Sequence, residues 1–168
     1  MELYINSKKH GVITAVIDDD DFELVNSFTW SVIRDKGTKN LYVMGHDKAI
    51  NRYKTIQMHR IITNCPMDKV VDHINHNTLD NRKSNLRICE RSDNCKNYMK
   101  PDKREYTSKY KGVSLKSKKH KFVAQISVNN KKIHIGYYDT EDKAAIAYNI
   151  AALKHHGEFA FLNNVMSI

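Results

Sequence analysis

Two short apolar segments on either side of a long polar loop constrain how the middle of this chain can fold. Val70-Val71 leads into Asp72-His73, and Leu86 to Cys89 follows after a stretch rich in Asn and Asp. Short apolar runs bounded by turn-forming residues predict strands, and Glu90 to Tyr98 can continue as a helix. The order strand, loop, strand, helix therefore predicts one small unit that carries Asp72-His73 at the end of its first strand and Asn94 on its helix.

The chain is strongly basic, and the excess charge is concentrated in its C-terminal part. Its 168 residues carry a formal net charge of +9, with an isoelectric point near 9.4. Residues 1–95 contain 14 Lys and Arg against 13 Asp and Glu, whereas residues 96–168 contain 14 against 6. Eight lysines and no acid lie between Lys109 and His134, a pattern that favours a polyanion such as nucleic acid as the partner.

An anionic membrane surface is the alternative partner for such a charge, and two observations argue against it. The lysines fall on strand-like segments, and no apolar run approaches the ~20 residues that span a bilayer. Cys65, Cys89 and Cys95 form no C-x-x-C pair, and no secretory signal opens the chain. We therefore expect a reducing, intracellular (cytoplasmic) location without a membrane, and the sequence indicates no obligate protein partner.

Alternating and helical hydrophobic patterns predict an α+β fold that opens with a β-rich extension at residues 1–68. Strands are expected on both sides of a turn at Lys9 to Gly11 and again from Phe28 onward. The acidic run Asp18 to Asp21 precedes a predicted short helix. Its carboxylates are therefore expected to cap that helix rather than to bind a metal.

A break in composition separates these segments from a second module. Residues 100–108 form a predicted linker, because Lys100 to Glu105 has no apolar side chain to bury apart from one proline. In the module at residues 109–164, alternation predicts three antiparallel strands, the last two joined by a turn at Asn129-Asn130. A helix should follow after an N-cap at Thr140 or the residue before it.

One face of this three-stranded sheet is predicted to pack on the helix, and the other to bind double-stranded DNA. The inward positions are apolar, whereas the outward positions combine cations for phosphates with groups that can hydrogen-bond to base edges. These outward residues are Lys111, Ser114, Lys116, Gln125, Ser127, Lys132 and His134. A β-sheet of this kind can enter a major groove, so the seven side chains are the predicted DNA contacts.

The side chains around the first strand suit the hydrolysis of a phosphodiester. His73, with an ordinary pKa of about 6.5, is largely neutral at physiological pH and could act as a general base. Asp72 and Asn94 offer hard oxygen ligands that suit Mg²⁺ or another divalent cation such as Mn²⁺. Asn85 can hold the loop in shape through hydrogen bonds. Arginines that could grip the DNA backbone lie beside this set, namely Arg82 and Arg87. A solvated loop is the alternative, because Asn-rich stretches are usually turns.

A series of short motifs at residues 56–99 carries a family resemblance. They are Met58-His59-Arg60, Val70 to Asn75, Leu79 to Arg82, Asn85 to Ile88, Ser92 to Asn94, and Asn97. Together they resemble the HNH homing-type endonucleases, which have a ββα-metal fold. The resemblance implies that Asp72 and Asn94 bind the metal, that His73 is the general base and that Asn85 steadies the loop.

The same resemblance leaves some positions open. His76 stands where relatives often have a glycine, so the shape of the loop is not implied. His59 is expected to pack in the core or at a helix start rather than to bind a metal. Residues 1–68 resemble the β-rich extension that precedes such motifs in phage-type homing endonucleases, and we expect them to support the motif by packing.

The C-terminal module carries a second resemblance. It rests on Tyr110 to Val113, Phe122 to Ile126, Ile135 to Thr140, Ala144 to Tyr148, Ala151-Ala152, His156-Gly157 and Leu162-Asn163. These segments look like the APETALA-two/ethylene-response-factor DNA-binding domain, in which three strands lie in the major groove and a helix packs behind them. Several positions that read bases in that family carry other side chains here, so no target sequence is implied.

The sequence therefore predicts a metal-dependent, site-directed DNA endonuclease that holds the duplex with its C-terminal sheet and nicks one strand per visit. The first alternative is a catalytically inactive, sequence-specific DNA-binding regulator, against which the joint presence of Asp72, His73 and Asn94 argues. The second alternative is an RNA-binding module. The lysine-rich sheet permits it, but the sequence does not indicate the aromatic stacking surface that favours single strands.

Overall fold

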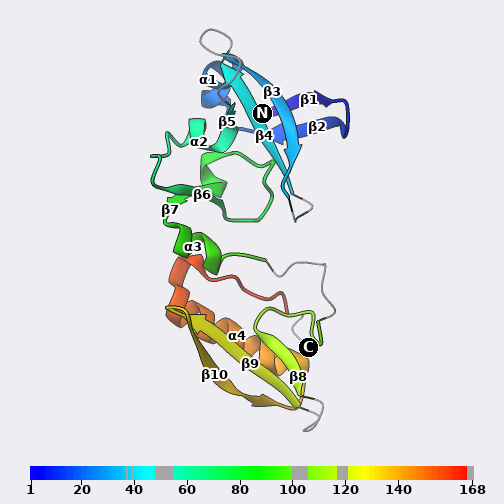
Figure 1. Cartoon of the computed structure of the whole chain (residues 1–168), viewed down its shortest axis with the longest axis vertical. Coiled ribbons are helices and arrows are strands. Elements are labelled where there is room, and N and C mark those ends of the chain that lie inside the picture. The colour runs from blue at the N-terminus through cyan, green and yellow to red at the C-terminus, as the bar shows by residue number, and fades with distance from the viewer. Residues whose placement is uncertain (37, 39, 48–54, 100–105, 117–120, 166–168) are drawn as a thin grey trace. The chain divides into compact units, whose positions relative to one another are not determined.

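The computed structural model describes residues 1–36, 38, 40–47, 55–99, 106–116 and 121–165, and it combines small antiparallel sheets with short helices (Figure 1). The predicted α+β class is confirmed in this general form. The chain divides into two compact units, residues 1–94 and residues 95–168. The predicted linker at 100–108 lies partly outside the described residues, because these omit 100–105. No helix in the described ranges is long and apolar enough to cross a membrane.

The first unit opens with a hairpin and a three-stranded sheet. The hairpin pairs β1 (Glu2–Ser7) with β2 (Gly11–Val16), and η1 (Asp19–Asp21) and α1 (Phe22–Asn26) follow it. The sheet has the order β3-β4-β5, with β3 at Phe28–Arg34, β4 at Leu41–Asp47 and β5 at Thr55–Gln57. Antiparallel hairpins need only short connections, which explains why sequence neighbours pair throughout this region.

The second half of this unit contains the segment with the Asp-His pair. Its elements are α2 (Met58–Ile62), β6 (Val70–His73), η2 (Lys83–Asn85), β7 (Leu86–Cys89) and α3 (Arg91–Lys96). Strand β6 pairs with β7 in an antiparallel register that sets Asp72 opposite Arg87 and His73 opposite Leu86. The two strands and α3 follow one another in the order expected from the sequence.

One hydrophobic core joins the two halves of the first unit. Its buried members are spread along the chain from β1 to β7, and they are Ile5, Ala15, Ile17, Val25, Val43, Met58, Ile62, Val71 and Leu86. Burying such side chains contributes roughly 1.5–3 kcal/mol each. The β-rich N-terminal strands therefore stabilise the β6–β7 hairpin directly.

The second unit is a three-stranded sheet with a helix packed on one face (Figure 1). Its strands are β8 (Val113–Lys116), β9 (Lys121–Val128) and β10 (Lys131–Tyr138), in the order β10-β9-β8, and α4 (Glu141–His156) and η4 (Gly157–Phe159) follow. The turn between β9 and β10 uses Asn129 and Asn130 at φ 50° and 61°, a conformation that asparagine tolerates well. Thr140 caps α4 by accepting a hydrogen bond from the Lys143 N–H at 3.2 Å. Both features are the predicted ones.

Gly112 lies where the backbone of the second unit passes close to Tyr148 on α4. It adopts φ +73°, and a Cβ at this position would lie 2.1 Å from Cδ2 of the buried Tyr148 and 2.6 Å from the carbonyl oxygen of Gln125. Gly11, the first residue of β2, has a similar φ of +71° but open space around it. The two glycines therefore share a backbone constraint and differ in packing.

We predict that Gly112→Ala destabilises the second unit far more than Gly11→Ala destabilises the first. The backbone cost of a left-handed alanine is about 1–2 kcal/mol at either position, and the clash at Gly112 adds roughly 1–3 kcal/mol. Urea unfolding of the full chain measures the stability of both units. Circular dichroism monitors the unfolding of α4 in the second unit, and Trp30 fluorescence monitors the first unit. Equal losses in the two variants would contradict the packing argument.

Candidate active site and DNA-binding face

The loop between β6 and β7 is closed by the side-chain amide of Asn85, which is almost completely buried. Its Oδ1 accepts the N–H of Asn75 at 2.9 Å, and its Nδ2 donates to the carbonyl oxygen of Asp80 at 2.8 Å. The backbone adds a bond from the Ile74 N–H to the Asn85 carbonyl oxygen at 2.9 Å. These bonds fix the chain immediately after His73.

A second clamp in the same loop is the pair between Arg82 and Asp80. The guanidinium donates from Nε to Oδ1 at 2.8 Å and from Nη2 to Oδ2 at 2.7 Å, and Asn75 Nδ2 donates to Oδ2 at 3.0 Å. The hydrogen bonds from Arg82 hold the pKa of Asp80 below its usual range. The side chain of Arg82 is 48% exposed, so its outer part still faces solvent.

The loop is also fastened to the N-terminal hairpin and its acidic run. Val16 exchanges backbone hydrogen bonds with the loop, donating to Leu79 at 2.8 Å and accepting from Asn81 at 2.7 Å. The Lys83 N–H donates to Asp18 Oδ2 at 2.7 Å, and the Lys83 ammonium pairs with Asp21 Oδ1 at 2.6 Å.

The expected side-chain caps are not formed, although the acidic residues do lie at the starts of the two short helices. Asp18 and Asp21 occupy the N-cap positions of η1 and α1, but neither makes a side-chain cap hydrogen bond. Their carboxylates turn to Lys83 instead, because an ammonium and a backbone N–H that approach from the loop form charge-assisted bonds. The run holds the loop rather than the helix that follows it.

His73 ends β6 in a buried environment of rings and polar side chains. Its ring centroid lies 5.0 Å from that of His59, edge-on, and 6.2 Å from that of Tyr42. Burial lowers the pKa of His73 from its ordinary value, and a side-chain hydrogen bond with Asn81 and the charges of Asp72 and Asp80 oppose that shift. A lowered pKa keeps the imidazole neutral at physiological pH, which is the form a general base requires.

His59 lies beside His73, and the sequence predicted a packing role for it. It lies in the first turn of α2 and is 5% exposed. Burial first, and then the charges of His73 and Arg60, lower the pKa of His59 to about 3. His59 is consequently a neutral ring that packs against His73 and Tyr42.

Asp72 is buried beside His73, and its carboxylate is paired with Arg87. Both Nε and Nη2 of Arg87 donate to Oδ2 of Asp72, at 2.8 Å and 2.6 Å. The Asp72 side chain is 6% exposed and that of Arg87 13%, so the pair is largely removed from solvent. Arg87 was predicted to grip DNA, and the structure brings it to the predicted metal ligand.

Asn94 lies on α3, half-buried, with its backbone N–H donating to the carbonyl oxygen of Glu90 at 3.1 Å. Among the residues that the structure describes, no group of three or more His, Cys, Asp or Glu side chains is placed to hold a metal ion. An ion at this site would therefore depend on the carboxylate of Asp72, the amide oxygen of Asn94, and water or phosphate oxygens. Oxygen donors of this kind fit Mg²⁺, which usually takes one or two carboxylates and keeps several waters.

Six of the seven predicted DNA-contact residues lie on the outer face of the second unit. Gln125, Ser127, Lys132, His134 and Lys116 are exposed, and Ser114 is half-buried. The register places Ser127 opposite Lys132 and Gln125 opposite His134, so these four side chains form one continuous surface across β9 and β10. Such a surface offers both cations and hydrogen-bonding groups to a duplex.

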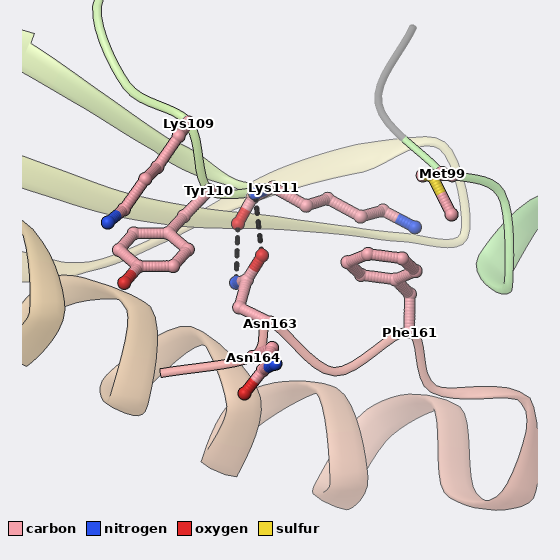
Figure 2. A pocket seen from close by; sticks show the side chains of 7 residues that line it. All are labelled: Met99, Lys109, Tyr110, Lys111, Phe161, Asn163 and Asn164. Atoms are coloured by element: carbon pink, nitrogen blue, oxygen red, sulfur yellow. Dashed lines mark hydrogen bonds between the residues drawn. The ribbon is translucent and has the colours of Figure 1, made fainter. Parts of the chain in front are cut away.

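Lys111 is the exception among the seven. Its ammonium donates to the carbonyl oxygens of Lys96 at 2.7 Å and Tyr98 at 2.8 Å, and its Nζ lies 5.0 Å from the centroid of the Phe161 ring (Figure 2). Asn163 holds its backbone through two hydrogen bonds of 2.7 and 3.0 Å, drawn as dashed lines in Figure 2. Burial lowers the pKa of Lys111 to about 8. In this structure Lys111 binds carbonyl oxygens at and just after the C-terminal end of α3, as cations commonly do at helix C-termini.

Tyr137 joins the outer face although strict alternation would have turned it inward. A β-bulge between His134 and Gly136 shifts the register, so Tyr137 lies opposite Val123 and its ring centroid is 4.8 Å from that of His134. The extra residue of a bulge reverses the parity of a strand beyond it. Gly136 inside the strand was the only sequence signal for such a bulge.

Comparison with known proteins gives two matches. Residues 64–96 match the family model described as HNH endonuclease. A protein of Acanthamoeba polyphaga mimivirus, described as an uncharacterized HNH endonuclease, is 29% identical over 87% of each chain. The family match includes Asp72, His73, Asn85 and Asn94, and the coverage of the viral relative means that the similarity reaches into both compact units.

The two matches support the prediction that the chain is an enzyme, a DNA nuclease of the HNH endonuclease type. The HNH part of the predicted resemblance is thereby confirmed. The second resemblance, of the C-terminal module, has no counterpart in these matches and remains a proposal.

We predict that His59 makes the first unit sensitive to acid. In the unfolded chain His59 takes up a proton as the pH falls below about 6.5. In the folded protein, where its pKa is about 3, it takes up a proton only at much lower pH. The stabilising effect of its neutral form is therefore complete above pH 6.5 and is lost progressively as the pH falls toward 3. Urea unfolding at pH 7 and pH 4.5 measures how much unfolding free energy is lost on acidification. This loss should be smaller for His59→Phe than for the wild type. His155→Phe, an exposed site, should lose as much as the wild type.

Proposed function

We propose that this protein is a divalent-metal-dependent, site-directed DNA endonuclease of the homing type, which nicks one strand of a duplex. The observation that carries the proposal is the buried Asp72-His73 pair at the end of β6, within the segment that matches the HNH endonuclease family. The sequence similarity to a viral protein of the same description supports it. Its place of action would be the cytoplasm of the cell that holds the target DNA.

In this proposal His73 is the general base. Its lowered pKa leaves it neutral, so it can accept a proton from water as the water attacks the phosphorus atom. The rings of His59 and Tyr42 limit the motion of the imidazole, and Asn85 fixes the backbone that follows it. A base held in one orientation reduces the entropy that the attacking step would otherwise cost.

Asp72 and Asn94 are the proposed metal ligands, with Mg²⁺ or Mn²⁺ as the ion. A divalent ion bound there would supply positive charge for the phosphate and the leaving oxygen. The two residues provide a carboxylate and an amide oxygen, while Arg82, half-exposed beside the loop, can contribute a contact to the DNA backbone. No His or Cys ligand is needed for an ion of this hardness.

The C-terminal sheet is the proposed anchor on double-stranded DNA. The continuous surface of Gln125, Ser127, Lys132 and His134, extended by Ser114 and Lys116, supports binding in the manner of an APETALA-two/ethylene-response-factor domain. Lys111 would contribute by fixing the start of the module rather than by contacting phosphate. One candidate catalytic centre in each chain favours nicking over a double-strand cut.

We predict that His73→Ala abolishes nicking of supercoiled plasmid in Mg²⁺ while duplex affinity stays within a few-fold of the wild type. The base makes little contact with DNA in the ground state, so its loss should appear in the rate of cleavage rather than in binding. Gel analysis of plasmid forms and a binding titration measure the two effects. Wild-type protein that binds duplex but never nicks it would instead favour an inactive DNA-binding regulator.

We predict that neutralising Lys116 and Lys132 together weakens duplex binding and flattens its salt dependence. Each phosphate contact that is lost should reduce the slope of log K against log salt by about 0.9. The double variant Lys143→Gln with Lys154→Gln is the matched control. Its two lysines lie on α4, and their replacement removes the same amount of charge. Equal slopes in both double variants would count against the sheet face, and preferential binding to single-stranded RNA would favour the RNA-binding alternative.

A further inference from the structure

The pair between Arg87 and Asp72 occupies the carboxylate that the proposed function assigns to the metal. Two N–H groups of Arg87 converge on Oδ2 of Asp72, and both side chains are largely buried. The register of β6 and β7 sets these residues directly opposite each other, so the contact is built into the hairpin. Arg87 is therefore the partner that any ion binding to Asp72 would meet first.

We propose that Arg87 is an exchangeable counter-ion: it neutralises Asp72 until a divalent cation binds there, and it then moves to a phosphate of the DNA. This inference rests on the proposed function, since it requires Asp72 to be a metal ligand. In this proposal Arg87 pairs first with the Asp72 carboxylate and then with the DNA phosphate.

Charge is the physical reason for the exchange. A guanidinium and a divalent cation repel each other, and the repulsion is strong where protein rather than water surrounds them. A buried carboxylate without a counter-charge is costly, so Arg87 stabilises Asp72 in the absence of an ion. Binding of the ion supplies that counter-charge and removes the reason for Arg87 to stay.

The displaced guanidinium fits the substrate better than a lysine would. Its planar array of N–H donors matches two oxygens of a phosphate, and it keeps its charge at any relevant pH. An arginine that must leave Asp72 before it can bind phosphate makes the cation and the DNA assist each other. Linkage then requires each of them to raise the affinity of the other by the same factor.

A matched control for the loss of charge lies elsewhere in the first unit. Arg34, at the end of β3, is exposed and has no proposed role in the loop, the cation site or DNA binding. Replacing either Arg34 or Arg87 removes one positive charge from the first unit, and only the Arg87 replacement should alter the binding of a cation at Asp72.

The experiment measures Mn²⁺ binding to the full chain by calorimetry, without DNA, so that no cleavage is needed. Arg87→Met should bind Mn²⁺ roughly ten-fold more tightly than the wild type. Arg87→Lys leaves a cation beside Asp72, so this variant and Arg34→Met should stay near the wild-type affinity. Thermal unfolding gives a second readout, because Arg87→Met should be less stable without Mn²⁺ and should regain more stability on its addition than Arg34→Met does.

The coupling to DNA is measured in a His73→Ala background, which prevents cleavage. A short duplex of mixed sequence should raise the Mn²⁺ affinity about five-fold or more when Arg87 is present, and this gain should be lost in the Arg87→Met double variant. Unchanged Mn²⁺ affinity in Arg87→Met, with Mn²⁺ binding still lost in Asp72→Asn, would overturn the exchange while the proposed metal site stands. Mn²⁺ binding that does not depend on Asp72 would instead overturn the proposed function itself.

Discussion

The closure of the loop after His73 is the constraint on which the candidate site depends. Asn85 joins the two ends of this loop through its amide, and Val16 and Lys83 fasten its middle to the N-terminal hairpin and the acidic run. Without these bonds the loop would be flexible, and the end of β6 would sample many positions. Bringing its side chains into one reactive arrangement would then cost conformational entropy. The N-terminal strands therefore contribute to the site although none of their side chains is a proposed ligand or base.

Local sequence rules were sufficient where a structure depends on local interactions. Alternation predicted the strands of the second unit, the two asparagines predicted the turn between β9 and β10, and Thr140 predicted the start of α4. In each case the relevant energy lies within a few residues, so it is legible in the sequence.

The same rules failed where a side chain chooses between distant partners. Asp18 and Asp21 could cap a helix or bind Lys83, and only the folded chain brings Lys83 within 2.7 Å. Lys111 was placed on the DNA face by alternation, whereas the carbonyl oxygens of Lys96 and Tyr98 hold its ammonium. The bulge that turns Tyr137 outward also follows from pairing between strands. Propensity and periodicity contain no information on such competitions.

The polar residues around His73 are expensive to bury, and this cost is itself informative. Asp72, His59, Asp80, Asn81 and Asn85 are all at most 5–6% exposed, close to the core that contains Val71 and Leu86. An apolar set of similar volume would pack there without needing hydrogen bonds or counter-charges, and replacement of buried ion pairs by apolar residues is often neutral or stabilising. A chain that keeps carboxylates, amides and two neutral imidazoles in such a place gives up stability there, which is the pattern common at functional sites. The Asn85 bonds and the Arg82 clamp account for Asn85 and Asp80 as parts of the loop, whereas loop closure does not account for the burial of Asp72, His73 and His59.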